Sequence, residues 1–251
     1  MFKNKIAIYE RYRPDYPDDL VQILKSKSLL KDNDIVAEFG CGTGKLTMLL
    51  LNNGNVVHGV EPEAEMTVFL QKKFARQSNF LLYNQSAETS NLPNKYFDVI
   101  ISAQSFHLFN AEKAKNEFYR IIKQNGFILL VWYFIDNHSP IAKDICSLFY
   151  QYGTIQNQQK RQEISIDDLQ KIFYPNIVSY QIINQFEQRF SNEEFINSML
   201  SSSYSPTKND PAYLNYVNTA QSIYDKYSTT ENHIKYNFQI HLYSLQPKGS
   251  L

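Results

Sequence analysis

The sequence has little of several features that would point to particular protein classes. It has two cysteines, Cys41 and Cys146, with neither a metal-ligand spacing nor a disulfide framework. Its 25 basic and 25 acidic residues leave no net charge and no sustained basic stripe, so strong nucleic-acid binding is not expected. No apolar run has the length of a membrane span or a signal-peptide core. These absences favour a cytoplasmic protein without metal, nucleic-acid or membrane partners.

What the sequence does have is a glycine-rich turn directly after a short apolar strand. The turn reads Glu38-Phe39-Gly40-Cys41-Gly42-Thr43-Gly44, and a helix-forming segment follows at 46–52. Alternating glycines let a ligand approach the backbone closely, because no Cβ stands in the way. The start of the helix adds backbone N–H groups that point outward. The pattern therefore predicts a nucleoside-type binding site.

Three known glycine-loop motifs could account for this pattern, and the spacing of their glycines distinguishes them. The dinucleotide motif G-x-G-x-x-G requires a third glycine where Lys45 stands. The phosphate loop requires glycine at Phe39 and Ser or Thr at Leu46. The remaining pattern, E-x-G-x-G-x-G, resembles the first motif of class I S-adenosylmethionine-dependent methyltransferases. A nicotinamide oxidoreductase and a glycine turn without a ligand stay open as alternatives.

A carboxylate ends the next predicted strand, at 56–61. Glu61 follows the first glycine by about twenty residues, where a carboxylate can accept hydrogen bonds from both hydroxyls of a ribose. Ribose is common to NAD and S-adenosylmethionine, so Glu61 alone does not choose between them. The resemblance implies S-adenosyl-L-methionine as cofactor and S-adenosyl-L-homocysteine as product.

Strands and helices alternate through about residue 133, which predicts a parallel sheet with both faces covered. The expected strands lie at 35–39, 56–61, 80–84, 97–103 and 127–133, and the expected helices at 46–52, 63–74 and 111–123. Further helices are expected at 139–152, 166–173, 192–200 and 210–227, around a strand at 179–186. The last segment, 235–243, alternates like an edge strand. The fold class is α/β and doubly wound. The resemblance adds a mostly parallel, seven-stranded, Rossmann-like sheet whose last strand is antiparallel.

We expect one methyltransferase domain over residues 1–251, as a monomer or homodimer. Its expected parts are an N-terminal lid and helix at 1–30 and a cofactor-binding core at 31–135. A helical insertion with the sixth strand, at 136–232, would cap the substrate, and the last strand would lie at 233–251.

Later segments match the same family in order. Ser86-Ala87-Glu88, followed by Leu92-Pro93 and Phe97-Asp98-Val99-Ile100, resembles its "A-E-x-L-P … F-D-V-I" segment. Relatives often carry an acid before the alanine that bonds the adenine amino group. Ser86 stands there, so the Ala87 backbone or the Glu88 side chain would serve instead. Met66, in the first turn of the helix after Glu61, is expected either on the adenine or in the core.

The N-terminal segment Tyr9-Glu10-Arg11-Tyr12-Arg13-Pro14-Asp15-Tyr16-Pro17 is similar to the "Y-x-x-Y-R-P-x-Y-P" segment of small-molecule methyltransferases, including trans-aconitate methyltransferase-like proteins. Its prolines predict an extended conformation. The resemblance implies a lid over the cofactor. In that lid Arg13 would pair with the methionine carboxylate, while Tyr9 and Tyr16 shield the sulfonium. The alternative is a surface segment whose tyrosines pack on the domain.

The segment after the fourth strand carries a candidate catalytic residue. His107 lies in Gln104-Ser105-Phe106-His107-Leu108, similar to the family's "F-H-W" with Leu108 for Trp. Ligands of open α/β sheets bind at the carboxyl ends of strands, so His107 is placed to act as a base near the methyl group. A structural role is the alternative. Ser203 and Tyr204 are expected to contact the acceptor, unless they belong to a polar loop between helices.

Together these residues predict an S-adenosylmethionine-dependent methyltransferase that acts on a small molecule by in-line displacement. A non-catalytic regulatory protein of the same fold, which binds the cofactor or a nucleoside, is the second hypothesis. The expected cofactor contacts are Tyr9, Arg13, Tyr16, Glu38, Gly40, Cys41, Gly42, Gly44, Glu61, Pro62, Met66, Ser86, Ala87, Glu88 and Gln104.

Overall fold

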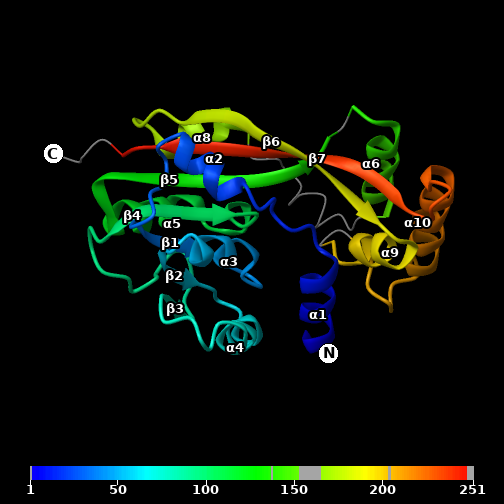
Figure 1. Ribbon diagram of the computed structural model, residues 1–251, viewed down its shortest axis with the longest axis horizontal. Helices are drawn as coiled ribbons and strands as arrows, with labels where there is room; N and C mark the ends of the chain where they lie inside the picture. The colour runs from blue at the N-terminus through cyan, green and yellow to red at the C-terminus, as the bar shows by residue number, and fades with distance from the viewer. Residues whose placement is uncertain (1, 137, 153–164, 203–204, 248–251) are drawn as a thin grey trace. The chain divides into compact units, whose positions relative to one another are not determined.

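The computed structural model describes residues 2–136, 138–152, 165–202 and 205–247 (Figure 1). The chain divides into two compact units. Unit 1 contains Met1–Pro14, Phe134–Glu163 and Gln185–Gln239, and unit 2 contains Asp15–Tyr133, Ile164–Asn184 and Ile240–Leu251. The single domain over residues 1–251 stays a prediction.

A seven-stranded sheet has the order β3-β2-β1-β4-β5-β7-β6. Its strands are β1 Ile35–Phe39, β2 Val56–Val60, β3 Phe80–Tyr83, β4 Phe97–Ala103, β5 Ile122–Ile135, β6 Ser179–Phe190 and β7 Ile234–Leu245. The pairs β1–β2, β1–β4, β2–β3 and β4–β5 are parallel. Figure 1 shows that β7 is antiparallel to β5 and β6. The predicted α/β fold with a mostly parallel sheet is confirmed.

The prediction of an edge strand at 235–243 is wrong, because β7 lies between β5 and β6. In the first half of β7, buried and exposed residues alternate, as in Ile234-Lys235-Tyr236-Asn237. Alternation reports that one face of a strand is polar, and it says nothing about whether both edges are hydrogen-bonded. The edge position belongs to β6, whose first four residues are all exposed.

The helices lie close to their predicted positions, with one exception at the N-terminus. They are α1 Phe2–Tyr12, α2 Leu20–Ser26, α3 Lys45–Asn52, α4 Ala64–Lys73, α5 Ala111–Ile121, α6 Pro140–Tyr152, α8 Ile166–Phe173, α9 Asn192–Leu200 and α10 Tyr213–Tyr227, with a 3₁₀ turn η1 at Phe106–Leu108. Residues Tyr9–Tyr12 are helical rather than extended. The helix ends just before Arg13-Pro14, because a residue that precedes proline disfavours the α conformation. Among the described residues no helix is both long and apolar enough to cross a membrane.

Helix α1 belongs to unit 1, where it contacts α9. The Tyr12 hydroxyl donates to Glu193 Oε1 at 2.5 Å. Within the same unit, the fully buried Tyr216 of α10 donates to the backbone carbonyl of Met199 at 2.8 Å. These polar contacts join α1, α9 and α10 at positions where each buried hydroxyl needs a partner.

A cluster of buried phenylalanines positions two turns of unit 2. Phe39 at the end of β1 lies 4.7 Å from Phe118 of α5, measured between ring centroids. Phe106 of η1 stacks on Phe173 of α8 at 5.7 Å. All four side chains are at most 1% exposed. Because Phe39 and Phe106 directly precede Gly40 and His107, packing of their rings fixes where those two residues emerge.

The loop between β3 and β4 is fastened to α5 by a buried carboxylate. Glu117 accepts from the backbone N–H of Ser90 at 2.9 Å and also from its hydroxyl. Arg120 donates to both oxygens of the same carboxylate, at 2.8 and 2.7 Å. Burial favours the neutral form, but hydrogen bonds from Arg120 and Ser90 outweigh it and lower the pKa of Glu117. Arg120 thus holds this carboxylate in place.

Replacing Glu117 by glutamine should lower the free energy of unfolding by about 1–3 kcal/mol, because the hydrogen-bond network loses its negative charge and one of its two acceptor oxygens. Urea unfolding monitored by circular dichroism measures this loss. Glu112→Gln on the same helix is the matched control. Glu112 is 65% exposed and pairs with Lys115, so its loss should cost less than about 0.5 kcal/mol. Equal losses in the two variants would contradict this account of the loop.

Candidate functional site

The glycine-rich turn adopts a backbone that depends on its three glycines. Gly40, Gly42 and Gly44 all have left-handed φ angles, of 66°, 58° and 77°. A Cβ on Gly44 would lie 2.5 Å from Phe74, whereas a Cβ on Gly42 would meet nothing nearer than a carbonyl oxygen at 4.0 Å. The turn is therefore packed from behind at Gly44 and open at Gly42. An open backbone at a left-handed glycine is a place where a ligand can approach closely.

Glu61 lies beside this open glycine. The Gly42 N–H donates to Glu61 Oε2 at 2.9 Å, and the Glu63 N–H donates to Oε1 at 3.1 Å. A carboxylate has about four lone-pair positions, so two acceptor positions remain after these bonds. Burial raises the pKa of Glu61, while the two N–H groups act in the opposite direction. This donor and acceptor set fits a ribose with adjacent hydroxyls.

Behind the turn, Glu38 is buried at 2% exposure. Its Oε2 accepts from the hydroxyl of Thr47 in α3 at 2.6 Å. Burial raises the pKa of Glu38 to about 8. The hydrogen bond from Thr47 and the positive charge of Lys73 oppose this rise, while the negative charge of Glu61 adds to it. Glu38 thus ties β1 to α3, and its role in cofactor binding stays a prediction.

Cys41 is enclosed within the same turn. Burial, followed by the nearby Glu38 and Glu61, raises the pKa of the Cys41 thiol well above its ordinary value. Because the thiolate is the nucleophile, a thiol that stays protonated at neutral pH is inert. Cys41 is therefore a small buried side chain in the turn, and its contact with the cofactor stays a prediction.

The segment after β4 meets the turn at Gly40. A Cβ on Gly40 would lie 2.6 Å from both Cβ and Oγ of Ser105. The Ser105 hydroxyl donates to the Phe39 carbonyl at 2.8 Å. Gln104 adopts a left-handed φ of 56°, and its side chain donates to the Tyr133 carbonyl at 2.9 Å. The carboxyl ends of β1, β4 and β5 are therefore linked by hydrogen bonds, with the glycine turn among them.

The loop after β3 is also tied to Glu61. Asn84 donates to the carbonyls of Glu61 and Pro62, at 2.9 Å each. Glu88 accepts from the backbone N–H of Asn110 at 2.8 Å. Burial raises the pKa of Glu88, but hydrogen bonds from Asn110 and Ser86 outweigh it and lower this pKa overall. Glu88 thus anchors the loop to α5.

Met66 lies in α4, which follows Glu61, and Ser86 lies in the loop after β3. The Ser86 hydroxyl bonds Thr89 Oγ1 at 3.2 Å, and Ala87 beside it is buried. Met66, in the first turn of α4, is half-buried and outside the fully buried core. Their contacts with adenine stay predictions.

His107 lies in η1 with an exposed side chain. The indole N–H of Trp132 donates to His107 Nδ1 across 3.4 Å. Since an indole nitrogen is a donor only, Nδ1 is the acceptor, and a neutral His107 then carries its proton on Nε2. In this arrangement the ring offers an N–H rather than a lone pair at Nε2. The expected base role would require Trp132 to give up this bond.

The predicted N-terminal contacts divide between the two units. In unit 2, Asp15 pairs with Lys45 at the start of α3, and Tyr16 is buried with its ring 5.6 Å from that of Tyr133. In unit 1, the Arg13 guanidinium lies 5.3 Å from the centre of the Tyr9 ring. The roles of Tyr9, Arg13 and Tyr16 at the cofactor stay predictions. Ser203 and Tyr204 lie outside the described residues.

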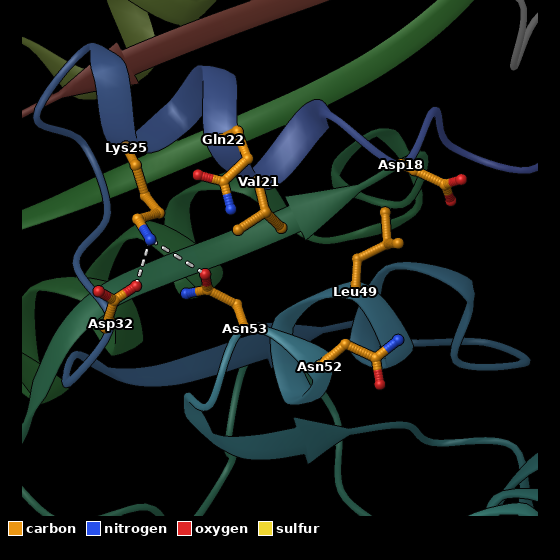
Figure 2. Close-up of a pocket in the computed structure, with 8 residues that line it drawn as sticks. All are labelled: Asp18, Val21, Gln22, Lys25, Asp32, Leu49, Asn52 and Asn53. Carbon is orange, nitrogen blue, oxygen red and sulfur yellow. Dashed lines mark hydrogen bonds and ion pairs between the residues drawn. The ribbon is translucent and has the colours of Figure 1, made fainter.

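A separate hollow of about 490 Å³ lies at α2 and α3 (Figure 2). Figure 2 shows Lys25 reaching both Asp32 and Asn53 across it. It is lined by Asp18, Val21, Gln22, Lys25, Asp32, Leu49, Asn52 and Asn53. None of these residues belongs to the predicted site, so the hollow and the glycine turn are distinct features of unit 2.

Four residues of the site escaped the sequence analysis: Thr47, Lys73, Asn84 and Trp132. Asn84 was expected as the last residue of a strand, yet β3 ends at Tyr83 and Asn84 caps two carbonyls. A polar residue directly after an apolar strand is a usable signal for such a role. Thr47 and Lys73 sit at ordinary helical positions and carry no comparable signal.

Glu38→Gln should change how stability depends on pH. The native carboxyl holds its proton up to about pH 8, whereas the unfolded chain releases it near its ordinary pKa. The wild type therefore loses stability as pH rises between these values. The variant should gain at least about 1 kcal/mol relative to wild type between about pH 5 and about pH 8. Urea unfolding at several pH values measures the gain, and Glu112→Gln should show none. A constant difference between Glu38→Gln and wild type would contradict the buried, protonated carboxyl.

Comparison with known proteins agrees with this geometry. The profile of the methyltransferase domain family matches residues 37–130. An uncharacterized methyltransferase-like protein of Schizosaccharomyces pombe is 32% identical over 152 residues, which are 60% of this chain and 58% of that protein. The chain thus spans little more than half the length of the curated relatives it matches.

Solved structures share the fold. A candidate type II methyltransferase from Anaeromyxobacter dehalogenans gives a TM-score of 0.66 at 17% identity, over 93% of this chain and 97% of that one. The Haemonchus contortus phosphoethanolamine N-methyltransferase 2, in complex with phosphomonomethylethanolamine and S-adenosylhomocysteine, gives 0.60 at 15% identity, over 99% of this chain and 59% of that one. Identities this low concern the fold alone. Residues 37–130 of the chain thus match the methyltransferase domain family, and the chain shares the fold of these solved structures.

Proposed function

We propose that the protein binds S-adenosyl-L-methionine and transfers its methyl group to a small-molecule acceptor. The observation that carries this proposal is the open left-handed Gly42, whose N–H is bonded to Glu61. The family match and the neighbour in complex with S-adenosylhomocysteine support the same cofactor. S-adenosyl-L-homocysteine would be the product.

Different residues around the turn would contact different parts of the cofactor. The backbone at Gly40, Gly42 and Gly44 would let the cofactor lie close to the turn, and the remaining acceptor positions of Glu61 would take the ribose hydroxyls. Pro62 and Met66 follow Glu61 along the chain, and Ser86 and Ala87 lie in the loop whose Asn84 bonds the Glu61 carbonyl. These four residues would surround the adenine. Glu88 and Gln104 would act by fixing the backbone of their loops, since their side chains bond Asn110 and Tyr133. Arg13 would pair with the methionine carboxylate, and Tyr9 and Tyr16 would shield the sulfonium.

The cofactor supplies a methyl group that is already activated by its sulfonium. The protein's task is then to align the acceptor with the methyl group and to exclude water. His107, with its proton on Nε2, would donate a hydrogen bond that orients the acceptor. An acceptor that attacks as a carboxylate needs no base, whereas a hydroxyl or carbon acid has to give up a proton to one. Ser203 and Tyr204 would complete the acceptor site. The cytoplasmic location and the monomeric or homodimeric state belong to the same proposal.

Isothermal titration calorimetry with S-adenosylmethionine, S-adenosylhomocysteine and NADH tests the cofactor assignment. We expect the first two to bind at sub-millimolar concentration, and NADH not to bind. Lack of binding by both sulfur compounds, or binding of NADH in their place, would overturn the proposal. Cofactor binding without turnover over a broad panel of acceptors would instead favour the non-catalytic regulatory protein.

Gly42→Ala should weaken cofactor binding by at least about 10-fold, because the new Cβ would occupy the approach to the backbone. Gly54→Ala is the matched control. Gly54 also has a left-handed φ, of 96°, and a Cβ there would meet nothing within 4 Å. Both variants should lose about 1 kcal/mol of stability from left-handed alanine, but only Gly42→Ala should lose affinity. Equal affinity in the two variants would contradict the position of the site.

A further inference from the structure

Lys73, the last residue of α4, reaches the glycine turn. Its ammonium donates to the backbone carbonyl of Thr43 at 2.9 Å. The N–H of the same peptide group belongs to Gly44 and donates to the Cys41 carbonyl at 2.8 Å. Both polar ends of the Thr43–Gly44 peptide are therefore bonded, which fixes the orientation of its plane.

The residue directly after α4 supports the next residue of the turn. Phe74 lies so close to Gly44 that a Cβ there would be 2.5 Å from Phe74 Cε2. The Lys73 ammonium lies 5.5 Å from the centre of the Phe74 ring, within the range of a cation–π contact. The last residue of α4 and the residue after it thus hold two consecutive residues of the turn, one through a hydrogen bond and one through packing.

Helix α4 also connects both parts of the site. It begins just after Glu61-Pro62-Glu63 and ends at the residue that bonds Thr43. The side of the turn that Gly42 leaves open is separate from the side that Phe74 packs, because a Cβ at Gly42 would meet no side chain within 4 Å. Lys73 therefore acts on the turn without occupying the open position.

We propose that Lys73 is a positioning residue for the cofactor, which keeps the Thr43–Gly44 peptide in the orientation that the binding turn requires. The proposal rests on the proposed function. A flexible turn would have to be ordered when the cofactor binds, and this cost would appear as lost affinity. Lys73 itself does not touch the ligand.

The experiment compares Lys73→Met, Lys73→Arg and Lys72→Met with the wild type. Lys72 is the exposed neighbour on the same helix, so Lys72→Met removes the same charge and leaves the turn alone. Calorimetric titration with S-adenosylhomocysteine should show an affinity at least about 10-fold lower in Lys73→Met, the size expected for a lost charged hydrogen bond. Lys72→Met should stay within about 2-fold of wild type, and Lys73→Arg should recover most of the loss.

Hydrogen exchange at residues 40–44 of the cofactor-free proteins supplies the second readout. Exchange should be faster in Lys73→Met than in Lys72→Met, while thermal unfolding confirms that both variants are folded. If Lys73→Met does not fold, Lys73→Gln takes its place in both measurements. Wild-type affinity and wild-type exchange in Lys73→Met would overturn the positioning role. Failure of the wild type to bind would contradict the proposed function instead, and exchange would still decide whether Lys73 holds the turn.

Discussion

The structure of the site depends on how closely two chain segments approach at the carboxyl ends of β1 and β4. Gly40 and Ser105 are so near that a single Cβ on Gly40 would collide with the serine side chain. The Ser105 hydroxyl bonds the Phe39 carbonyl and also pairs with Ser102 Oγ at 2.7 Å. Glycine is the residue that this approach and the left-handed φ both require. Once the approach is fixed, the open Gly42 and the 3₁₀ turn with His107 have defined positions.

Packing below this contact makes the approach stable. The buried rings of Phe39 and Phe106 belong to one aromatic cluster, so the two segments emerge from the same part of the core. Polar groups under the turn are bonded as well: Glu38 to Thr47, and the Thr43 carbonyl to Lys73. Buried polar groups that have their partners hold a backbone in one arrangement, because breaking any bond leaves a group unsatisfied. The turn is therefore shaped by its supports before any ligand arrives.

Much of this organisation could be predicted from the sequence. Strands such as β1 and β2 are buried over nearly their whole length, and unbroken apolar runs are their direct signal. The alternating glycines and Glu61 identified the two parts that now lie hydrogen-bonded to each other.

Other features depend on tertiary contacts that no local pattern encodes. The sequence places Glu88 among the expected ligand contacts, yet its carboxylate accepts a hydrogen bond from the backbone N–H of Asn110. The alternation of polar and apolar residues in β7 reflects one polar face of the strand, although the strand has neighbours on both edges. Tyr9 to Tyr12 belong to helix α1, which ends two residues before Pro14, although the prolines suggested an extended segment. The hydrogen bond from Trp132 to His107 joins residues 25 positions apart. This bond bears on whether His107 acts as a base or as a hydrogen-bond donor.

The central claim is that the turn from Gly40 to Gly44 and Glu61 form the cofactor site. Titration of ¹⁵N-labelled protein with S-adenosylhomocysteine, followed by amide chemical shifts, tests it most directly. The account predicts that the largest shifts occur at Gly40–Gly44, Glu61 and Gln104, in proportion to occupancy. Shifts concentrated instead around Lys25, Asn52 and Asn53, at the hollow of α2 and α3, would contradict it.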